Sequence, residues 1–183
     1  MCIRDRVYLH PAARQGLDTQ NRAAGAQTRL SQLNEHFTVL VNEFTQLRSP
    51  QAPCQFAVIP LRSIAGFPII DRFHVGELVF EVVESLGGHV PGQVFFLNRA
   101  FGLLFTSDYL LDVASLSRQE KDYLRLPRYL MTSTNIDSDV FRKETAMLRQ
   151  LIDQENHSLS RDGISVTVFP GHGDYYCTPG GNT

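Results

Sequence analysis

The stretch that decides the fold is residues 78–108, with the sequence LVFEVVESLGGHVPGQVFFLNRAFGLLFTSD. It contains three runs of apolar, β-branched and aromatic residues, at 78–83, 93–97 and 103–106. Each run has the length of a strand, and glycine-containing turns separate them. The turn at 98–102 has the composition of a hairpin loop. We therefore expect consecutive strands that pair with one another, rather than the alternating strands and helices of a parallel sheet.

Helical patterns lie on both sides of these strands. Apolar residues recur every three or four positions between 17 and 47, which indicates an amphipathic helix. A second helix is expected to begin at a cap on Asp137 or Ser138 and to run through Ile152. Shorter elements are expected as strands at 7–9, 56–59 and 165–169 and as a helix at 115–123. This order favours an α/β protein of the α+β kind, with a layered sheet and helices on one outer face.

Composition excludes several classes of protein. The chain has 183 residues, of which 43% are hydrophobic and 20% charged, as in an ordinary globular domain. Its formal net charge of −2 gives no sign of a nucleic-acid-binding surface. No apolar run reaches the ~18 residues that a membrane span needs. The three cysteines have no metal-ligand spacing, so a reducing, cytoplasmic compartment is the default expectation.

Three loops that follow predicted strands contain residues with metal-binding chemistry. They hold His89, Asp108 and His172, and glycines flank both histidines. Imidazole nitrogen and carboxylate oxygen are the usual ligands of catalytic zinc, and they also suit iron and manganese. One carboxylate can bridge two cations, which together lower the pKa of a water between them. Each residue alone is more often a turn or surface residue, so the prediction depends on the set of three.

Three motifs resemble, in chain order, the metal-binding loops of the metallo-β-lactamase superfamily, as in glyoxalase II-like metal-dependent hydrolases. They are GHVPG at 88–92, FTSD at 105–108 and PGHG at 170–173. The resemblance covers the chain from about Ile69 onward. It implies an αββα sandwich. Ser107 stands where the family usually has glycine, and this bears on the local backbone angle.

The resemblance also implies roles for the three residues. His89 would complete the histidine set of a first metal, Asp108 would bridge both metals, and His172 would bind the second. The implied cofactors are two divalent ions, zinc in the first place and iron or manganese as alternatives. The implied reaction is hydrolysis of a small-molecule ester, thioester, lactam or phosphodiester by metal-activated water. No further catalytic residue and no substrate-binding residue is identified.

An upstream HxHxDH motif, which members of this family carry, is missing. The remaining histidines, His10, His36, His74 and His157, are expected to be structural or solvated. We expect residues 1–6 to be a non-native leader, 7–176 to be a partial domain truncated at its N-terminal portion, and 177–183 to be a loose tail. The metals are therefore expected to bind weakly, with little activity. Because the native start is expected to lie upstream, the expected cytoplasmic location does not exclude an export signal in the natural protein.

Two other functions fit the sequence. One is a non-catalytic binding or scaffold protein of the same fold, which would keep the fold without the metals. The other is an oxidoreductase with a di-iron site, although this class normally brings a separate flavin-binding domain. We also expect dimerisation through an exposed apolar sheet face, assigned to Val79, Val94, Phe96 and Leu104. No nucleic-acid or membrane partner is expected.

Overall fold

The structure is a computed structural model that describes residues 8–20, 54–55, 58–130 and 135–179. Within these ranges, a small parallel sheet consists of β1 (Tyr8–Leu9) and β2 (Cys54–Gln55). The strands of the large sheet are β3 (Arg62–Ile64), β4 (Phe67–Val75), β5 (Leu78–Glu84), β6 (Val94–Asn98), β7 (Leu103–Ser107), β8 (Thr167–Pro170) and β9 (Tyr176–Cys177). The helices are α1 (Pro11–Gln20), α3 (Arg118–Leu130), α4 (Ser138–Leu159) and the short 3₁₀ helix η2 (Ser160–Asp162).

Strands of the large sheet lie side by side in chain order, from β3 to β9. All neighbours are antiparallel except β7 and β8, which are parallel and are connected through α3 and α4. The expected α+β architecture with consecutive paired strands is confirmed. Since β5, β7 and β8 run in the same direction, their C-terminal ends lie at the same edge of the sheet. The loops that follow them therefore meet at that edge.

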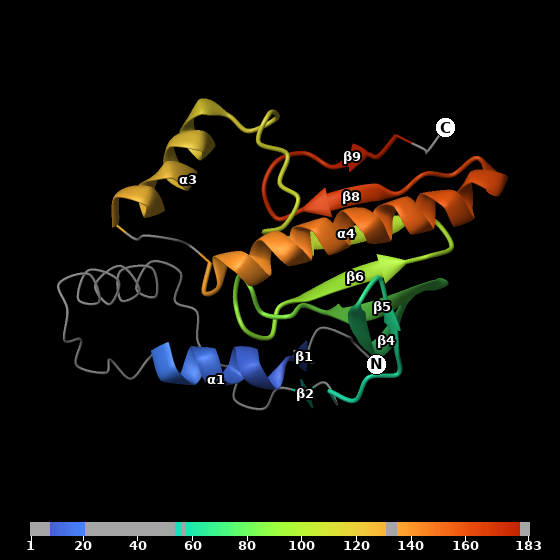
Figure 1. Ribbon diagram of the computed structural model, residues 1–183, viewed down its shortest axis with the longest axis horizontal. Coiled ribbons are helices and arrows are strands. Elements are labelled where there is room, and N and C mark those ends of the chain that lie inside the picture. Colours follow the sequence, from blue (N-terminus) through green and yellow to red (C-terminus); the bar gives the residue numbers. More distant parts are fainter. Residues whose placement is uncertain (1–7, 21–53, 56–57, 131–134, 180–183) are drawn as a thin grey trace.

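Helix α4 covers one face of the large sheet (Figure 1). It begins where the sequence predicts, because the Asp137 side chain accepts hydrogen bonds from the main-chain N–H groups of Asp139 and Val140. Its apolar side packs on the sheet in a single core, whose fully buried members include Phe67, Ile69, Val83, Phe95, Leu97, Leu104, Leu148, Leu151, Val166 and Val168. This packing anchors the start of α4 beside the edge where the three loops meet.

The opposite face of the sheet carries a row of aromatic rings. Phe80 stacks on Phe73 at 5.4 Å between ring centroids and meets Phe105 edge-on at 5.9 Å. Phe105 stacks on Phe169 at 4.6 Å, and Phe169 on Tyr175 at 5.5 Å. These ring contacts therefore form one continuous row, which extends across β6 between Phe80 and Phe105 and ends at Tyr175, just before β9.

The expected exposed face was wrong in two members. Val79 alternates with Phe80 along β5, so it lies on the α4 face of the sheet, where it is 40% exposed. Leu104 is fully buried in the core under α4, because residues alternate between the two faces along β7 and Leu104 lies opposite Phe105. Phe96 does lie on the aromatic face, where it meets Phe73 edge-on at 5.2 Å. Dimerisation through this face stays a prediction.

Some boundaries differ from the expected ones. Strand β4 was missed, since Pro68 and a bulge between Ile69 and Asp71 break its alternation. Helix α1 begins at Pro11, and the rest of the helix expected at 17–47 lies outside the described residues. Residues 58–59 are not in a strand, and α3 begins at Arg118 rather than 115.

The expected loose tail begins too early. Cys177 pairs with Thr167 in the sheet, and the Thr178 main-chain N–H donates to Val166 O at 2.8 Å. These bonds hold the chain to the end of the sheet through Thr178. Among the described residues, none of the helices combines the length and apolar character that crossing a membrane requires.

The end of β7 is strained. Ser107 has φ +50°, in the left-handed region that favours glycine. A Ser107→Gly substitution should therefore raise the free energy of unfolding by about 0.5–1 kcal/mol, the relieved strain less the extra entropy of glycine in the unfolded chain. Urea unfolding measures this. The matched Ser160→Gly change, at φ −57°, should lower the stability instead, and a loss at both positions would contradict the role of strain at Ser107.

Candidate metal centre

His89, Asp108 and His172 come together at the edge where β5, β7 and β8 end. His89 Nε2 lies 3.1 Å from Asp108 Oδ2, and His172 Nε2 lies 3.5 Å from Asp108 Oδ1. Each carboxylate oxygen therefore faces a different imidazole. The Asp108 side chain is 39% exposed, whereas that of His89 is 15% exposed. The residues that the sequence motifs single out thus lie in one row with Asp108 in the middle.

The His89 ring is held from both nitrogens. Its Nδ1 lies 2.7 Å from Asn135 Oδ1, which accepts, so Nδ1 carries a proton. Its Nε2 faces the Asp108 carboxylate, also an acceptor. The hydrogen bond to Asp108 raises the pKa of His89, while burial acts against this increase and Asn135 adds to it. Without a metal, the ring is therefore favoured as an imidazolium that donates from both nitrogens.

The Asp108 carboxylate is stabilised in its charged form. The hydrogen bond from His89 lowers its pKa, burial opposes this, and the charges of His89 and His172 add to the lowering. Close packing fixes its position, because a Cβ on Gly171 would lie 2.7 Å from Asp108 Oδ1. The Gly171 N–H donates to Ser107 O at 2.6 Å. Glycine at 171 therefore lets the loop after β8 lie directly against the carboxylate.

The loop that carries His89 is bound by one buried carboxylate of α4. Glu144 is fully buried, and its Oε1 accepts from the Leu86 N–H at 2.5 Å. Its Oε2 accepts from the Gly88 N–H at 2.9 Å. A Cβ on Gly88 would lie 2.5 Å from the same oxygen, so only glycine allows this approach. The contact joins the His89 loop, which follows β5, to α4.

Two hydroxyl groups connect this carboxylate to further N–H groups of the loop. The Ser85 hydroxyl donates to Glu144 Oε1 at 2.7 Å and accepts from the Gly87 N–H at 3.0 Å. The Tyr109 hydroxyl donates to Oε2 at 2.7 Å and accepts from the His89 N–H at 3.1 Å. Burial raises the pKa of Tyr109, so its hydroxyl keeps the proton that it donates. The N–H groups of residues 86–89 are therefore all bonded to Glu144, directly or through one hydroxyl.

The carbonyl groups of this loop bind the start of α4. The Asp137 N–H donates to Gly88 O at 3.0 Å, and the Ile136 N–H donates to His89 O at 3.1 Å. The segment 135–144 thus bonds directly to the N–H groups of Leu86 and Gly88 and to the carbonyl groups of Gly88 and His89. This segment also supplies Asn135, which fixes the ring of His89.

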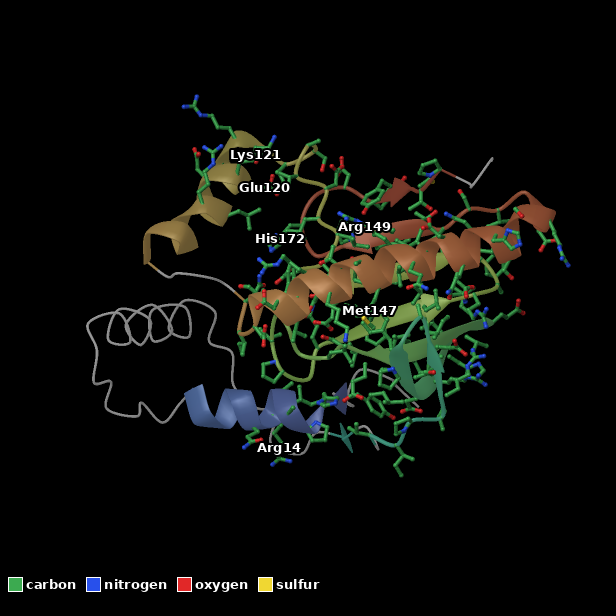
Figure 2. The ribbon with its side chains drawn as sticks, in the orientation of Figure 1. Arg14, Glu120, Lys121, Met147, Arg149 and His172 are labelled. Atoms are coloured by element: carbon green, nitrogen blue, oxygen red, sulfur yellow. The ribbon has the colours of Figure 1, made fainter. Side chains whose placement is uncertain are left out.

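His172 is the more open of the two histidines, with 47% of its side chain exposed. It lies on the side of the molecule that carries Glu120 of α3 (Figure 2). The pKa of Glu120 is lowered mainly by hydrogen bonds from Ser117 and to a smaller extent by the charge of His172. The loop around His172 is held by Ser115, whose hydroxyl accepts from the Asp174 N–H at 2.7 Å.

These donors suit divalent cations, but they do not form one complete site. Among the described residues, no group of three or more His, Cys, Asp or Glu side chains converges as a metal-binding cluster. The arrangement is instead two histidine–carboxylate pairs that share Asp108. A bridging carboxylate with one imidazole on each oxygen is the part of a two-metal centre that these residues can form.

Sequence reasoning found the three candidate ligands but missed their supports, Asn135, Tyr109, Glu144 and Ser85. The usable signal was at Glu144, which lies three residues after Phe141 and four before Leu148 on the apolar side of α4. A charged residue at such a position needs a partner.

The other histidines lie apart from this row. His10 hydrogen-bonds to Glu84 at 2.9 Å, and His74 and His157 are exposed. These three follow the structural or solvated interpretation. His36 lies outside the described residues.

Comparison with known proteins gives matches among solved structures only; no family model and no curated protein matches the chain. TTHA1623, crystallised in a di-iron-bound form, is 22% identical with a TM-score of 0.43, over 96% of this chain and 61% of that one. The metallo-beta-lactamase family protein TTHA1429 from Thermus thermophilus is 16% identical with a TM-score of 0.48, over 94% and 48%. A beta-lactamase domain protein from Burkholderia ambifaria is 17% identical with a TM-score of 0.44, over 94% and 40%.

The chain therefore spans less than two thirds of each of these structures. The family that the sequence motifs resemble is the one named for TTHA1429.

The His89–Asp108 pair predicts a pH dependence of stability in metal-free protein. The pKa of His89 in the folded protein is above 6.5. Its contribution to the free energy of unfolding is therefore full below pH 6.5 and is lost as the pH rises through the folded pKa. The folded pKa of Asp108 is below 3.8, so its contribution is present above pH 3.8 and is lost as the pH falls through the folded value. Thermal unfolding should therefore show the largest destabilisation by Asp108→Asn between these two pH values.

The control is Asp139→Asn, which removes an exposed carboxylate that pairs with Arg142. Because Arg142 stays charged, the destabilisation caused by Asp139→Asn should not decline as the pH rises above 6.5. An Asp108→Asn effect that is constant from pH 4 to 9 would show that His89 is not the partner responsible.

Proposed function

We propose that this chain contributes the bridging part of a two-metal centre in a metal-dependent hydrolase of the metallo-β-lactamase kind. One observation carries the proposal: each oxygen of Asp108 faces the Nε2 atom of a different histidine, at 3.1 and 3.5 Å. A salt bridge that serves only stability does not need a second imidazole on the free oxygen. Two glycines add support: Gly171 lets the loop after β8 lie against Asp108, and Gly88 lets the His89 loop lie against Glu144 of α4.

The residues fit a pair of divalent cations by their chemistry. His89 would supply Nε2 to one cation and His172 to the other, with Asp108 shared between them. Bound divalent cations supply Lewis acidity and lower the pKa of water to near neutrality. Asn135 would hold the Nδ1 proton of His89, which keeps Nε2 as the nitrogen that faces Asp108. For a cation to bind His89, the Nε2 proton must leave.

Affinity in this chain is expected to be weak. Catalytic zinc usually has three protein ligands, and the row supplies two ligands for each cation. The other ligands of a functional centre would have to come from outside the described residues. We therefore expect weak metal binding and little turnover of ester, thioester, lactam or phosphodiester substrates.

One alternative function and one alternative metal remain to be tested. A non-catalytic scaffold of this fold would keep the loops without binding metals. Iron is the second metal to test, because the matched protein TTHA1623 was crystallised in a di-iron-bound form. Zinc, iron and manganese should therefore be compared on the same metal-free protein.

The test is metal titration of the metal-free chain by calorimetry, followed by metal analysis after dialysis. Wild-type protein should bind zinc weakly, and Asp108→Ala should lower the apparent affinity by at least ~10-fold, since one carboxylate serves both cations. His172→Ala should weaken one of two binding events and leave the other.

Asp139→Ala is the control for nonspecific binding by carboxylates, because the Asp139 side chain is 88% exposed and pairs with Arg142 rather than with a histidine. Equal zinc affinity in wild type and Asp108→Ala would remove Asp108 from the site. Tight binding of one zinc or iron per chain would contradict the expectation of an incomplete centre. Absence of binding at millimolar metal would favour the scaffold.

A further inference from the structure

Glu144 occupies an unusual environment for a charged residue. It lies on the apolar side of α4, between Phe141 and Leu148, and none of its surface is exposed. A carboxylate in such a position is costly unless hydrogen bonds compensate for the lost water. Its partners are four donors from the loop that follows β5 and from the segment after β7.

Through these four donors, Glu144 is linked to the main-chain N–H groups of the consecutive residues 86–89. Leu86 and Gly88 donate to Glu144 directly. Gly87 donates to the Ser85 hydroxyl, and His89 donates to the Tyr109 hydroxyl, both of which donate to Glu144. One carboxylate thereby orders four N–H groups in a row. A residue that only stabilised the core would not need to collect every amide of the loop that ends on His89.

The Tyr109 link connects both candidate ligands. Tyr109 directly follows Asp108 in the chain, and its hydroxyl accepts from the His89 N–H at 3.1 Å. Its ring stacks on Phe141 of α4 at 4.6 Å and meets Phe95 edge-on at 5.2 Å. The positions of His89 and Asp108 relative to each other are therefore set through Tyr109 and Glu144, besides their direct contact.

We infer that Glu144 is a positioning residue, which holds the 86–89 loop and, through Tyr109, sets His89 against Asp108 so that their side chains are arranged before a cation binds. This inference rests on the proposed function for its metal-binding consequence. Its structural consequence can be measured without metal.

The test compares Glu144→Gln with Glu155→Gln. Glu155 is also buried on α4, but it pairs with Arg99 at 2.8 Å, away from the loop. In metal-free protein, Glu144→Gln should speed amide hydrogen exchange of residues 86–89 at least ~10-fold, and a crystal structure should show His89 Nε2 beyond hydrogen-bond range of Asp108. Glu155→Gln should leave both features as in wild type, although it too lowers the melting temperature.

Zinc titration, followed by the NMR signal of the His89 Cε1–H, gives the functional readout. Glu144→Gln should weaken the response of His89 ~10–100-fold, as removal of a supporting partner does in metal sites, and Glu155→Gln should not. If wild type shows no zinc response, the proposed function fails for this chain, while exchange and the crystal structure still decide the positioning role.

Tyr109→Phe covers the case in which Glu144→Gln does not fold. It removes only the hydroxyl, so faster exchange should be confined to the His89 amide, with a smaller loss of zinc response. Wild-type exchange at 86–89 in Glu144→Gln, or at His89 in Tyr109→Phe, would overturn the inference. An equal loss of zinc response in Glu155→Gln would also overturn it.

Discussion

The buried carboxylate of Glu144 is the constraint on which the candidate centre depends. A charge removed from water must be matched by donors, and here the donors come from two segments that lie 56–59 and 35 residues away in the chain. The hydrogen bonds of this one side chain therefore bring the His89 loop, Tyr109 and α4 together. Gly88 is part of the same requirement, since a Cβ there would collide with the carboxylate.

Sheet topology supplies the second half of the arrangement. The only parallel pair in the large sheet of the described residues is β7 and β8, and this pair places the ends that carry Asp108 and His172 at neighbouring positions. An antiparallel pair would have sent the two residues to opposite edges. The long connection through α3 and α4 is what permits the parallel pairing, and α4 covers the core in the same passage. The helix that stabilises the sheet is thus also the helix that supports the His89 loop.

Much of this could be predicted from the sequence where the pattern is local. The strands β5, β6 and β7 and the cap at Asp137 follow from apolar runs, turn residues and side-chain chemistry within a few positions. Strand β4 could not, because Pro68 and a bulge disturb its period. The three candidate ligands were found through motif order, and the structure brings them into one row. The partners of Glu144 were out of reach, because hydrogen bonds to residues 35 or more positions away leave no periodic signal.

Metal-free and metal-bound states of such a row compete for the same atoms. Without a cation, the hydrogen bonds to Asp108 and Asn135 raise the pKa of His89 and so favour a protonated ring beside the carboxylate. A cation has to displace that proton and still leave Asp108 neutralised, so the pair that stabilises the metal-free row also opposes metal binding. If only two ligands are available for each cation, the proton competes effectively with the metal for His89. A third ligand would shift this equilibrium toward the metal-bound state. Under the proposed function, the same side chains would therefore act as an ion pair without metal and as a bridge where the coordination is complete.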